Sequence, residues 1–145
     1  MDVEIELLEG AKMPTYATEG SAGLDLYANI KESCIFMSSN RVVIPTGIKV
    51  KIPPGYEAQI RSRSGNSANF GFFVLNSPGT IDSDYRGEVK VILFNTDSKN
   101  FIIEPGMKIA QMVISKYERV SLQLVEKVEN DTERGSGGFG STGNK

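Results

Sequence analysis

Ser77-Pro78-Gly79-Thr80-Ile81-Asp82-Ser83-Asp84-Tyr85-Arg86-Gly87 is the stretch around which the rest of this chain is arranged. It separates two runs that read as strands, Asn69 to Leu75 and Glu88 to Phe94, at a spacing typical of a hairpin. Because strand interiors disfavour Asp and Gly, and a Pro-Gly pair interrupts a ladder, we expect its two carboxylates and its phenol to lie on or beside a turn. Rigidly held loops often carry chemistry, although a purely polar turn is the simpler interpretation of this stretch alone.

Short apolar runs with turn signals between them extend in both directions from this stretch. The expected strands cover residues 3–8, 22–28, 35–37, 41–44, 48–52, 56–60, 89–95, 101–103, 109–115 and 120–125. Residues 13–21 read as an irregular loop, and at most one or two helical turns follow Arg63-Ser64-Gly65, through Asn66-Ser67-Ala68. This pattern predicts an all-β sandwich or barrel.

Asp25 is the one charged residue of the expected strand at 22–28. A carboxylate inside an apolar strand is costly unless it is paired. We therefore expect Asp25 to form a buried ion pair with an arginine.

Composition narrows the class of protein. The 145 residues suit one domain, and no apolar run approaches the roughly 18 residues that a membrane span requires. The N-terminal residues do not read as a secretory signal, and the single Cys34 fits a reducing compartment, so we expect a cytoplasmic protein. A net charge of -2 argues against duplex nucleic acid as the main partner.

The absence of histidine limits the possible chemistry further. With one cysteine and no histidine, zinc sites of the usual ligand types are excluded, as are Ser-His and Cys-His nucleophile pairs. A general base in this protein is expected to be a carboxylate, or less favourably a lysine.

The C-terminal residues have the composition of a mobile arm. The apolar pattern fades from Glu126, and the glycine-rich run from Arg134 to Gly143 holds one aromatic residue, Phe139. A disordered tail is the simplest interpretation. Glycine amides, hydroxyls and a guanidinium could nevertheless hold an anion while the ring stacks on a base, as a flap over a nucleotide would need.

Two further motifs are weak when taken singly. Arg63-Ser64-Gly65 combines a cation, a hydroxyl and an unhindered amide at a strand end, and Lys108 to Met112 alone reads as a strand containing Gln111. Together and in this order, the motifs resemble those of the homotrimeric dUTP diphosphatases (dUTPases). The five matching motifs are Ala22 to Leu26, Arg63 to Gly65, Gly79 to Gly87, Lys108 to Met112 and Arg134 to Gly143.

The resemblance implies a fold, an assembly and an activity. The fold is a distorted jelly-roll β-barrel with one short helix, covering residues 1–128, and residues 129–145 form a flexible arm that closes a neighbour's active site. The assembly is a homotrimer in which each site draws motifs from all three chains. The activity is hydrolysis of dUTP to dUMP and pyrophosphate by attack of water on the α-phosphorus, which keeps uracil out of DNA and supplies dUMP for thymidylate synthesis.

The same resemblance implies roles for individual residues. Asp82 would be the catalytic base. The substrate-binding set would be Arg63, Ser64, Gly65, Asn76, Gly79, Thr80, Ile81, Tyr85, Gln111, Arg134, Phe139, Gly140, Ser141 and Thr142, with Asp25, Asp84 and Arg86 in supporting roles. Mg²⁺ would be held through substrate phosphates and waters, without dedicated protein ligands.

Two departures from the family pattern and two alternatives stay open. Ser62 stands where proline often precedes the arginine of the second motif, and Lys108 stands where the fourth usually begins with arginine. A dCTP deaminase shares the implied fold, although those relatives generally lack the Gly-rich Phe tail. A catalytically silent trimer that binds a nucleotide or a regulatory protein is the alternative from another class.

Overall fold

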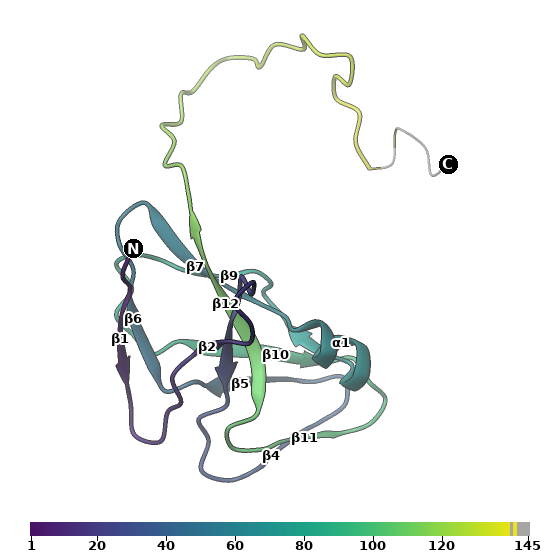
Figure 1. Ribbon diagram of the computed structural model, residues 1–145. Helices are drawn as coiled ribbons and strands as arrows, with labels where there is room; N and C mark the ends of the chain where they lie inside the picture. Colours follow the sequence, from purple (N-terminus) through teal and green to yellow (C-terminus); the bar gives the residue numbers. More distant parts are fainter. Residues whose placement is uncertain (140, 142–145) are drawn as a thin grey trace.

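The computed structural model describes residues 1–139 and 141 (Figure 1). Its elements, in chain order, are β1 (Glu4–Leu7), β2 (Thr15–Tyr16), β3 (Leu24–Tyr27), β4 (Cys34–Phe36), β5 (Arg41–Pro45), β6 (Ile48–Lys51), β7 (Tyr56–Arg61), α1 (Ser64–Phe70), β8 (Phe72–Val74), β9 (Gly79–Ile81), β10 (Lys90–Asn95), β11 (Phe101–Ile103) and β12 (Lys108–Lys116). The expected all-β class with one short helix is confirmed. No helix within the described part of the chain has the length and apolar character to cross a membrane.

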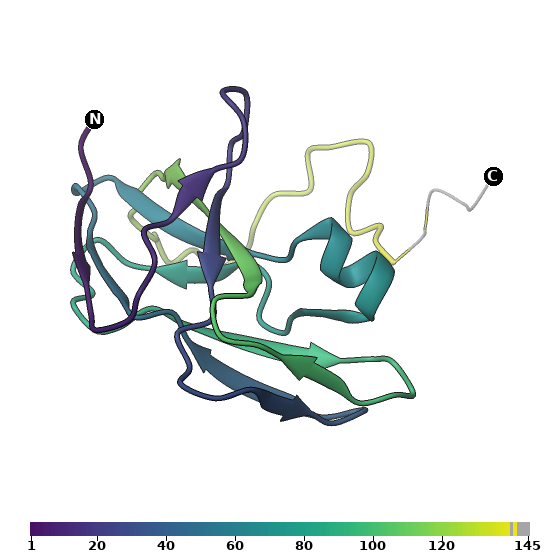
Figure 2. The same cartoon turned by 60° about the horizontal axis from the view of Figure 1, so that its bottom comes forward.

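The strands form four antiparallel sheets. Their orders are β2-β3-β12-β7-β9, β5-β10-β8, β1-β6 and β11-β4. The two views show β1 and β6 at one end of the molecule and α1 at the other (Figures 1 and 2). Within residues 1–139 and 141 these sheets do not close into the expected barrel, because sheets of two and three short strands leave edges unpaired.

The largest sheet separates the core from a polar surface. On its inner face lie buried residues such as Leu26, Ile60 and Met112, whereas their chain neighbours Asp25 and Gln111 face the other way. Since successive side chains of a strand alternate between faces, one run of sequence supplies both the core and a polar face. Phe36, Phe72 and Leu93 from the smaller sheets help to fill the core.

The region around the opening stretch is more elaborate than a simple hairpin. β8 and β10 do pair antiparallel, with Val74 opposite Leu93, so the expected strand pairing is confirmed. However, Asn69 and Phe70 belong to α1, and Gly79–Ile81 form β9, which pairs with β7 in the other sheet. The connection therefore crosses between sheets, because the break at Ser77-Pro78 frees the next three residues to find a second partner strand.

The expected strands also differ from the structure at two other places. Thr15–Tyr16 form β2 within the segment that was expected to be an irregular loop, pairing with β3. Residues 120–125 are not a strand: after β12 the chain leaves the body of the molecule as an extended tail (Figure 1). Their apolar alternation has no partner strand in the described part of this chain, and Leu122 and Leu124 are 92% and 98% exposed.

Candidate active site

A cleft of about 340 Å³ lies over the polar face of the largest sheet. It brings together residues that the sequence placed in three separate motifs. The predicted site residues that line it are Asp25, Arg63, Ser64, Gly65 and Gln111. One chain thus gathers the first, second and fourth motifs into a single cavity.

Asp25 is the electrostatic centre of this cleft. It is 6% exposed, and its Oδ1 accepts a hydrogen bond of 2.9 Å from Nε of Arg63. Its Oδ2 lies 2.7 Å from Nζ of Lys108, an ion pair that lacks hydrogen-bond geometry. The predicted buried ion pair with an arginine is confirmed, and the lysine at the family's arginine position acts as a second, point-like cation.

A β-bulge in β12 explains how Lys108 reaches Asp25. Lys108 pairs with Tyr27 and Ala110 with Leu26, so Ile109 is an extra residue in the ladder. A bulge shifts the alternation by one position, which turns Lys108 onto the face of Asp25 while Ile109 and Ala110 are both buried. The buried Asn66 of α1 donates from Nδ2 to the carbonyl oxygens of Lys108 (3.1 Å) and Ile109 (3.3 Å), which fastens the helix to the bulge.

The orientation of Gln111 is fixed from two sides. Its Nε2 donates to the carbonyl oxygen of Ser62 at 2.9 Å. A Cβ at Gly23 would lie 2.3 Å from Oε1 of Gln111, so a side chain at position 23 would push the amide of Gln111 out of its present orientation. Ser62 in turn accepts a 2.9 Å bond through Oγ from the backbone N–H of Val74, a contact that proline at this position could not make.

The loop that carries Asp82 is a turn, as predicted. Residues 83–84 form the turn, and the N–H of Tyr85 bonds to the carbonyl oxygen of Asp82 at 3.2 Å. Asp82, Asp84 and Tyr85 are all exposed. The hydroxyl of Tyr85 donates to the carbonyl oxygen of Glu88 at 3.0 Å, and the ring lies so close to Gly87 that a Cβ there would be 2.4 Å from the hydroxyl oxygen.

Other predicted residues of this stretch support the loop. Nη1 of Arg86 donates to the carbonyl oxygens of Ser83 (2.7 Å) and Tyr85 (2.8 Å). The amide of Asn76 packs beside Gly79, which begins β9, and Thr80 is exposed next to it. The predicted role of Arg86 in holding the turn agrees with these bonds.

The register of β9 carries Asp82 away from the cleft. Gly79 pairs with Ile60 and Ile81 with Ala58, so the next residue, Asp82, comes level with Glu57. Arg63 lies beyond the other end of β7. At about 3.3 Å per strand residue, the two groups are roughly 20 Å apart along the strand direction. Asp82 does not line the cleft that holds Arg63, Ser64 and Gln111.

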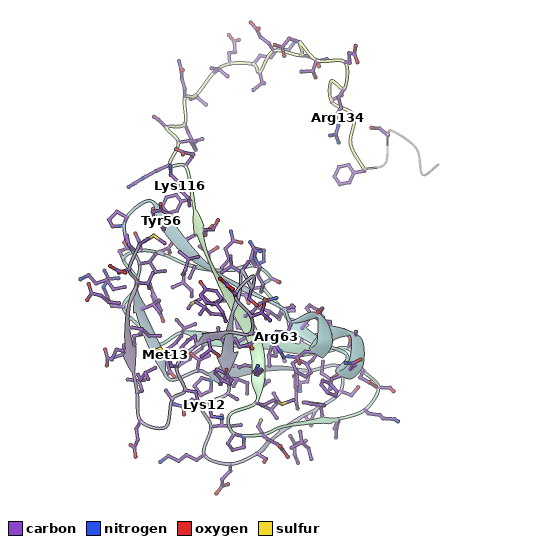
Figure 3. The ribbon with its side chains drawn as sticks, viewed as in Figure 1. Lys12, Met13, Tyr56, Arg63, Lys116 and Arg134 are labelled. Carbon is purple, nitrogen blue, oxygen red and sulfur yellow. The ribbon has the colours of Figure 1, made fainter. Side chains whose placement is uncertain are left out.

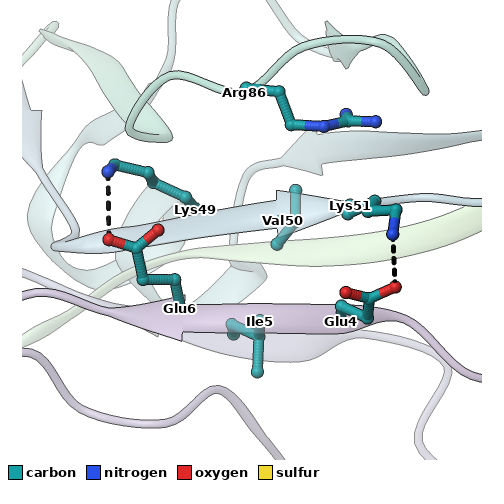
Figure 4. A pocket seen from close by; sticks show the side chains of 7 residues that line it. All are labelled: Glu4, Ile5, Glu6, Lys49, Val50, Lys51 and Arg86. Atoms are coloured by element: carbon teal, nitrogen blue, oxygen red, sulfur yellow. Dashed lines mark hydrogen bonds and ion pairs between the residues drawn. The ribbon is translucent and has the colours of Figure 1, made fainter.

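The side chain of Arg86 also extends over a shallow pocket beside β1 and β6 (Figure 4). Two exposed ion pairs cross this two-stranded sheet, Lys49 with Glu6 (3.0 Å) and Lys51 with Glu4 (2.6 Å). The hydrogen bond and charge of Lys51 lower the pKa of Glu4 below its ordinary value, and Arg86 adds a smaller effect in the same direction. These pairs link β1 to β6, and none of their residues lines the cleft.

The predicted residues of the tail lie outside the body of the molecule. Arg134 is carried well away from Arg63 (Figure 3). Nε of Arg134 donates to the carbonyl oxygen of Gly137 at 2.9 Å, the N–H of Ser141 bonds to the carbonyl oxygen of Gly138 at 3.0 Å, and Phe139 is fully exposed. Gly140 and Thr142 lie outside the described residues.

Sequence reasoning missed two residues that shape the site. Asn66 was seen only as part of a short helix, although a polar side chain next to Gly65 on a packed helix could have indicated a buried anchor. Arg61 also lines the cleft, and its place two residues before Arg63 on a strand was the available signal. Ser62 was noticed as a departure but its bond to Val74 was not foreseen.

Residues that could hold a metal ion directly are not gathered anywhere in the described part of the chain, where no group of three or more Asp, Glu or Cys side chains forms a suitable cluster. Both oxygens of Asp25 already face cations. Asp82 and Asp84 are exposed carboxylates on one turn. The donor set therefore suits a hard cation that brings its own phosphate and water ligands, rather than a protein cage.

Comparison with known proteins agrees with this geometry. The family model described as dUTPase matches residues 9–143. Deoxyuridine 5'-triphosphate nucleotidohydrolase of Orientia tsutsugamushi (strain Boryong) is 55% identical over 143 residues, covering 98% of this chain and 96% of that protein. The protein of the same name from Chlamydia trachomatis serovar L2 is 51% identical over 138 residues, covering 95% of each.

Solved structures give the same result. The Staphylococcus bacteriophage 80alpha dUTPase with dUPNHPP superposes with a TM-score of 0.84 at 27% identity, covering 98% of both chains. A mutant dUTPase from phage phi11 of S. aureus, reported to reveal the coordination of a structural Mg(II) ion, has a TM-score of 0.80 at 26% identity, covering 89% of this chain and 99% of that one.

Proposed function

Because this chain belongs to the dUTPase family and hydrolyses dUTP to dUMP and pyrophosphate, we propose that it does so in active sites assembled from three copies of the chain. As a dUTP diphosphatase it keeps uracil out of DNA and supplies dUMP for thymidylate synthesis. The single Cys34 supports a location in the reducing cytoplasm.

One observation carries the proposal of shared sites: the separation of Asp82 from the cleft. Hydrolysis requires a base and a bound triphosphate in contact, but the register of β9 puts the two roughly 20 Å apart in one chain. A second copy can bring its Asp82 to the cleft of the first. In a closed cyclic assembly, every cleft receives an Asp82 from a neighbouring copy.

The tail supports association of this chain with other copies. Val120, Leu122 and Leu124 alternate in sequence and are 72%, 92% and 98% exposed, which is unfavourable for a chain that stays alone. An apolar pocket of about 390 Å³ around Met1, Met13 and Tyr16 offers a further surface for contact. We propose a homotrimer in which residues 129–145 of each copy reach a site built by the other two. For each subunit we propose the distorted jelly-roll barrel of the family.

In the proposed mechanism the cleft holds the phosphates. The Ser64 hydroxyl, the Gly65 amide and the Gln111 side chain contact the α- and β-phosphates, and Arg63 contributes through its guanidinium while Asp25 fixes its direction. The neighbour's Asp82 orients a water in line with the leaving pyrophosphate and accepts its proton. Positioning and charge neutralisation, more than covalent help, supply the rate enhancement.

Base and sugar selection are assigned to the loop of the second copy. Asn76 and the backbone around Gly79, Thr80 and Ile81 read the uracil edge, and unmatched polar groups reject cytosine. The ring of Tyr85, fixed by Glu88 and by its packing on Gly87, lies under the deoxyribose where a 2'-hydroxyl would collide. Asp84 and Arg86 hold the turn and the interface.

The tail of the third copy completes the site. We assign the γ-phosphate to Arg134, Ser141 and Thr142, and the stack over uracil to Phe139. Phe139 has a positive φ of 49°, an unusual backbone for a residue other than glycine, so its neighbours must set the ring position. The exposed ring supports this role, because burial on a bound base would remove its apolar surface from water.

The family is metal-dependent, and Mg²⁺ is the ion that we propose. It would be held through substrate phosphate oxygens and waters, because both oxygens of Asp25 already face Arg63 and Lys108. When bound to the triphosphate, Mg²⁺ neutralises charge on the phosphate oxygens.

The decisive experiment measures pyrophosphate release from dUTP, dTTP, dCTP and UTP side by side with Mg²⁺, and ammonia release from dCTP. We expect pyrophosphate from dUTP alone at a high rate and no ammonia. Ammonia release would instead identify a deaminase. Analytical ultracentrifugation of the same sample should give three chains per particle, and a monomer with full activity would contradict the shared site.

A further inference from the structure

The two arginines of the cleft have different partners. Arg63 is neutralised by the buried carboxylate of Asp25. Arg61 is exposed and donates from both Nε (3.1 Å) and Nη2 (2.5 Å) to Oε1 of Gln59, the oxygen of an uncharged amide. Within residues 1–139 and 141, Arg61 has no acidic partner at ion-pair distance.

Gln59 separates Arg61 from the nearest carboxylate of its own strand. Alternation on β7 puts Glu57, Gln59 and Arg61 on one face, and Nε2 of Gln59 donates to Oε1 of Glu57 at 2.7 Å. The amide thus binds the carboxylate with one end and the guanidinium with the other. Gln59 therefore orients the guanidinium of Arg61, and no carboxylate of the described residues neutralises its charge.

The position of Arg61 is as informative as its charge. It pairs directly with Gln111 across β7 and β12, and Gln111 pairs with Asp25 across β12 and β3. Asp25, Gln111 and Arg61 therefore form one row across the sheet under the cleft. Among the described residues lining this cavity, two arginines accompany one carboxylate, and Lys108 adds a third cation through its ion pair with Asp25.

We infer that Arg61 is a phosphate-binding residue, the group that provides the unneutralised positive charge of the cleft to the triphosphate chain of the substrate. This inference rests on the proposed placement of the phosphates beside Gln111. Arg61 reaches a phosphate oxygen by exchanging a neutral acceptor for an anionic one, and a guanidinium can bind a phosphate through two parallel N–H···O bonds. Gln59 holds the side chain ready and releases it at little cost.

The test combines three single variants measured on the trimer. Arg61→Gln should raise KM for dUTP about tenfold or more with a small change in kcat, and should reduce the salt dependence of kcat/KM. Gln59→Glu leaves Arg61 in place but pairs its charge, and should raise KM in the same direction. Lys49→Gln removes an exposed cation on β6 and should change neither quantity.

Binding without turnover separates this inference from the proposed mechanism. Calorimetry with dUpNHpp and with dUMP, on Arg61→Gln in an otherwise wild-type chain, should show a loss of affinity that is several times larger for the triphosphate analogue. Equal losses for both ligands, or unchanged KM and unchanged affinity, would overturn the role. A variant that only weakens the trimer would also overturn it, since Arg61 would then face a partner chain. These binding measurements need no turnover, so they test Arg61 even if Asp82 is not the catalytic base.

Discussion

The side chains of the cleft over the largest sheet are held by bonds to other elements, whereas those of the loop at Asp82 are not. In the cleft, Asp25 fixes Arg63 and Lys108, Ser62 fixes Gln111, and Asn66 fastens the helix above them. The loop is held only by bonds within itself, and its carboxylates face solvent. One chain therefore contains a preorganised cleft, which we propose holds the phosphates, and an exposed carboxylate, which we propose is the base.

The difference indicates which part of the proposed active site depends on a second copy of the chain. Groups that must hold a highly charged ligand are rigid before the ligand arrives, which reduces the entropy lost on binding. The group that we propose acts on the bound ligand, Asp82, is exposed, where another copy could reach it. The following changes test this division, beginning with the largest expected effect.

Removing the carboxylate of the loop should abolish most turnover without affecting the cleft. Asp82→Asn is expected to reduce kcat by about 10² to 10⁴ while dUTP still binds, because only the proton acceptor is lost. Single-turnover kinetics and calorimetry with dUTP would measure the two properties. Normal turnover in this variant would show that the base lies elsewhere.

Removing the arm should reveal whether the cleft alone can organise the γ-phosphate. Deletion of residues 134–145 is expected to leave a folded trimer with about 10² lower kcat/KM, through the loss of several hydrogen-bond donors and of the stacking ring. Sedimentation and steady-state kinetics on the same preparation check both statements. A truncated enzyme with full activity would mean that the arm has no part in the reaction.

Opening the sugar pocket should change specificity more than rate. A steric wall usually discriminates by about 10² against an added hydroxyl. Tyr85→Ala should therefore lower the ratio of kcat/KM for dUTP to that for UTP by roughly that factor. Tyr85→Phe is the matched control, because it keeps the ring and loses only the bond to Glu88. The ratio of kcat/KM for dUTP and UTP is the measurement, and an unchanged ratio in Tyr85→Ala counts against the assigned role.

Neutralising the centre of the cleft should destabilise the fold and not only the site. Asp25→Asn leaves Arg63 and Lys108 facing each other without a carboxylate, and we expect a loss of about 1 to 3 kcal/mol after allowing for the partial exposure of both cations. Urea unfolding measures this change. Glu4→Gln, which breaks the exposed pair with Lys51, should leave the midpoint unaltered. Equal effects of the two substitutions would remove the distinction between a prepared cleft and an ordinary surface.

Much of the fold was predictable because short apolar runs are separated by turn residues at a regular spacing. The ion pair of Asp25 was predictable because burial of its strand demanded a partner. Two features were not. β9 follows a proline-glycine pair that normally marks a turn. Residues 120–125 have a strand pattern without a strand, because apolar alternation alone does not supply a partner strand.

The site was predictable in its membership but not in its geometry. Motif order indicated which residues act together, and the cleft does unite Asp25, Arg63, Ser64, Gly65 and Gln111. The bulge at Ile109, on which the direction of Lys108 depends, leaves no mark in a pattern of alternating hydrophobicity. Asn66 acts through carbonyl groups, whose positions are a property of the folded backbone.

The bulge also affects how this enzyme can evolve. Because Ile109 and Ala110 turn inward one after the other, the strand can exchange the residue at position 108 without altering what lies beneath the sheet. Lysine and arginine are therefore interchangeable there as far as the interior is concerned, and the exchange changes the shape of the cation but not its charge. Gly23 has less freedom, since an added Cβ would displace the amide of Gln111. Positions around one cleft thus differ in the variation they can tolerate.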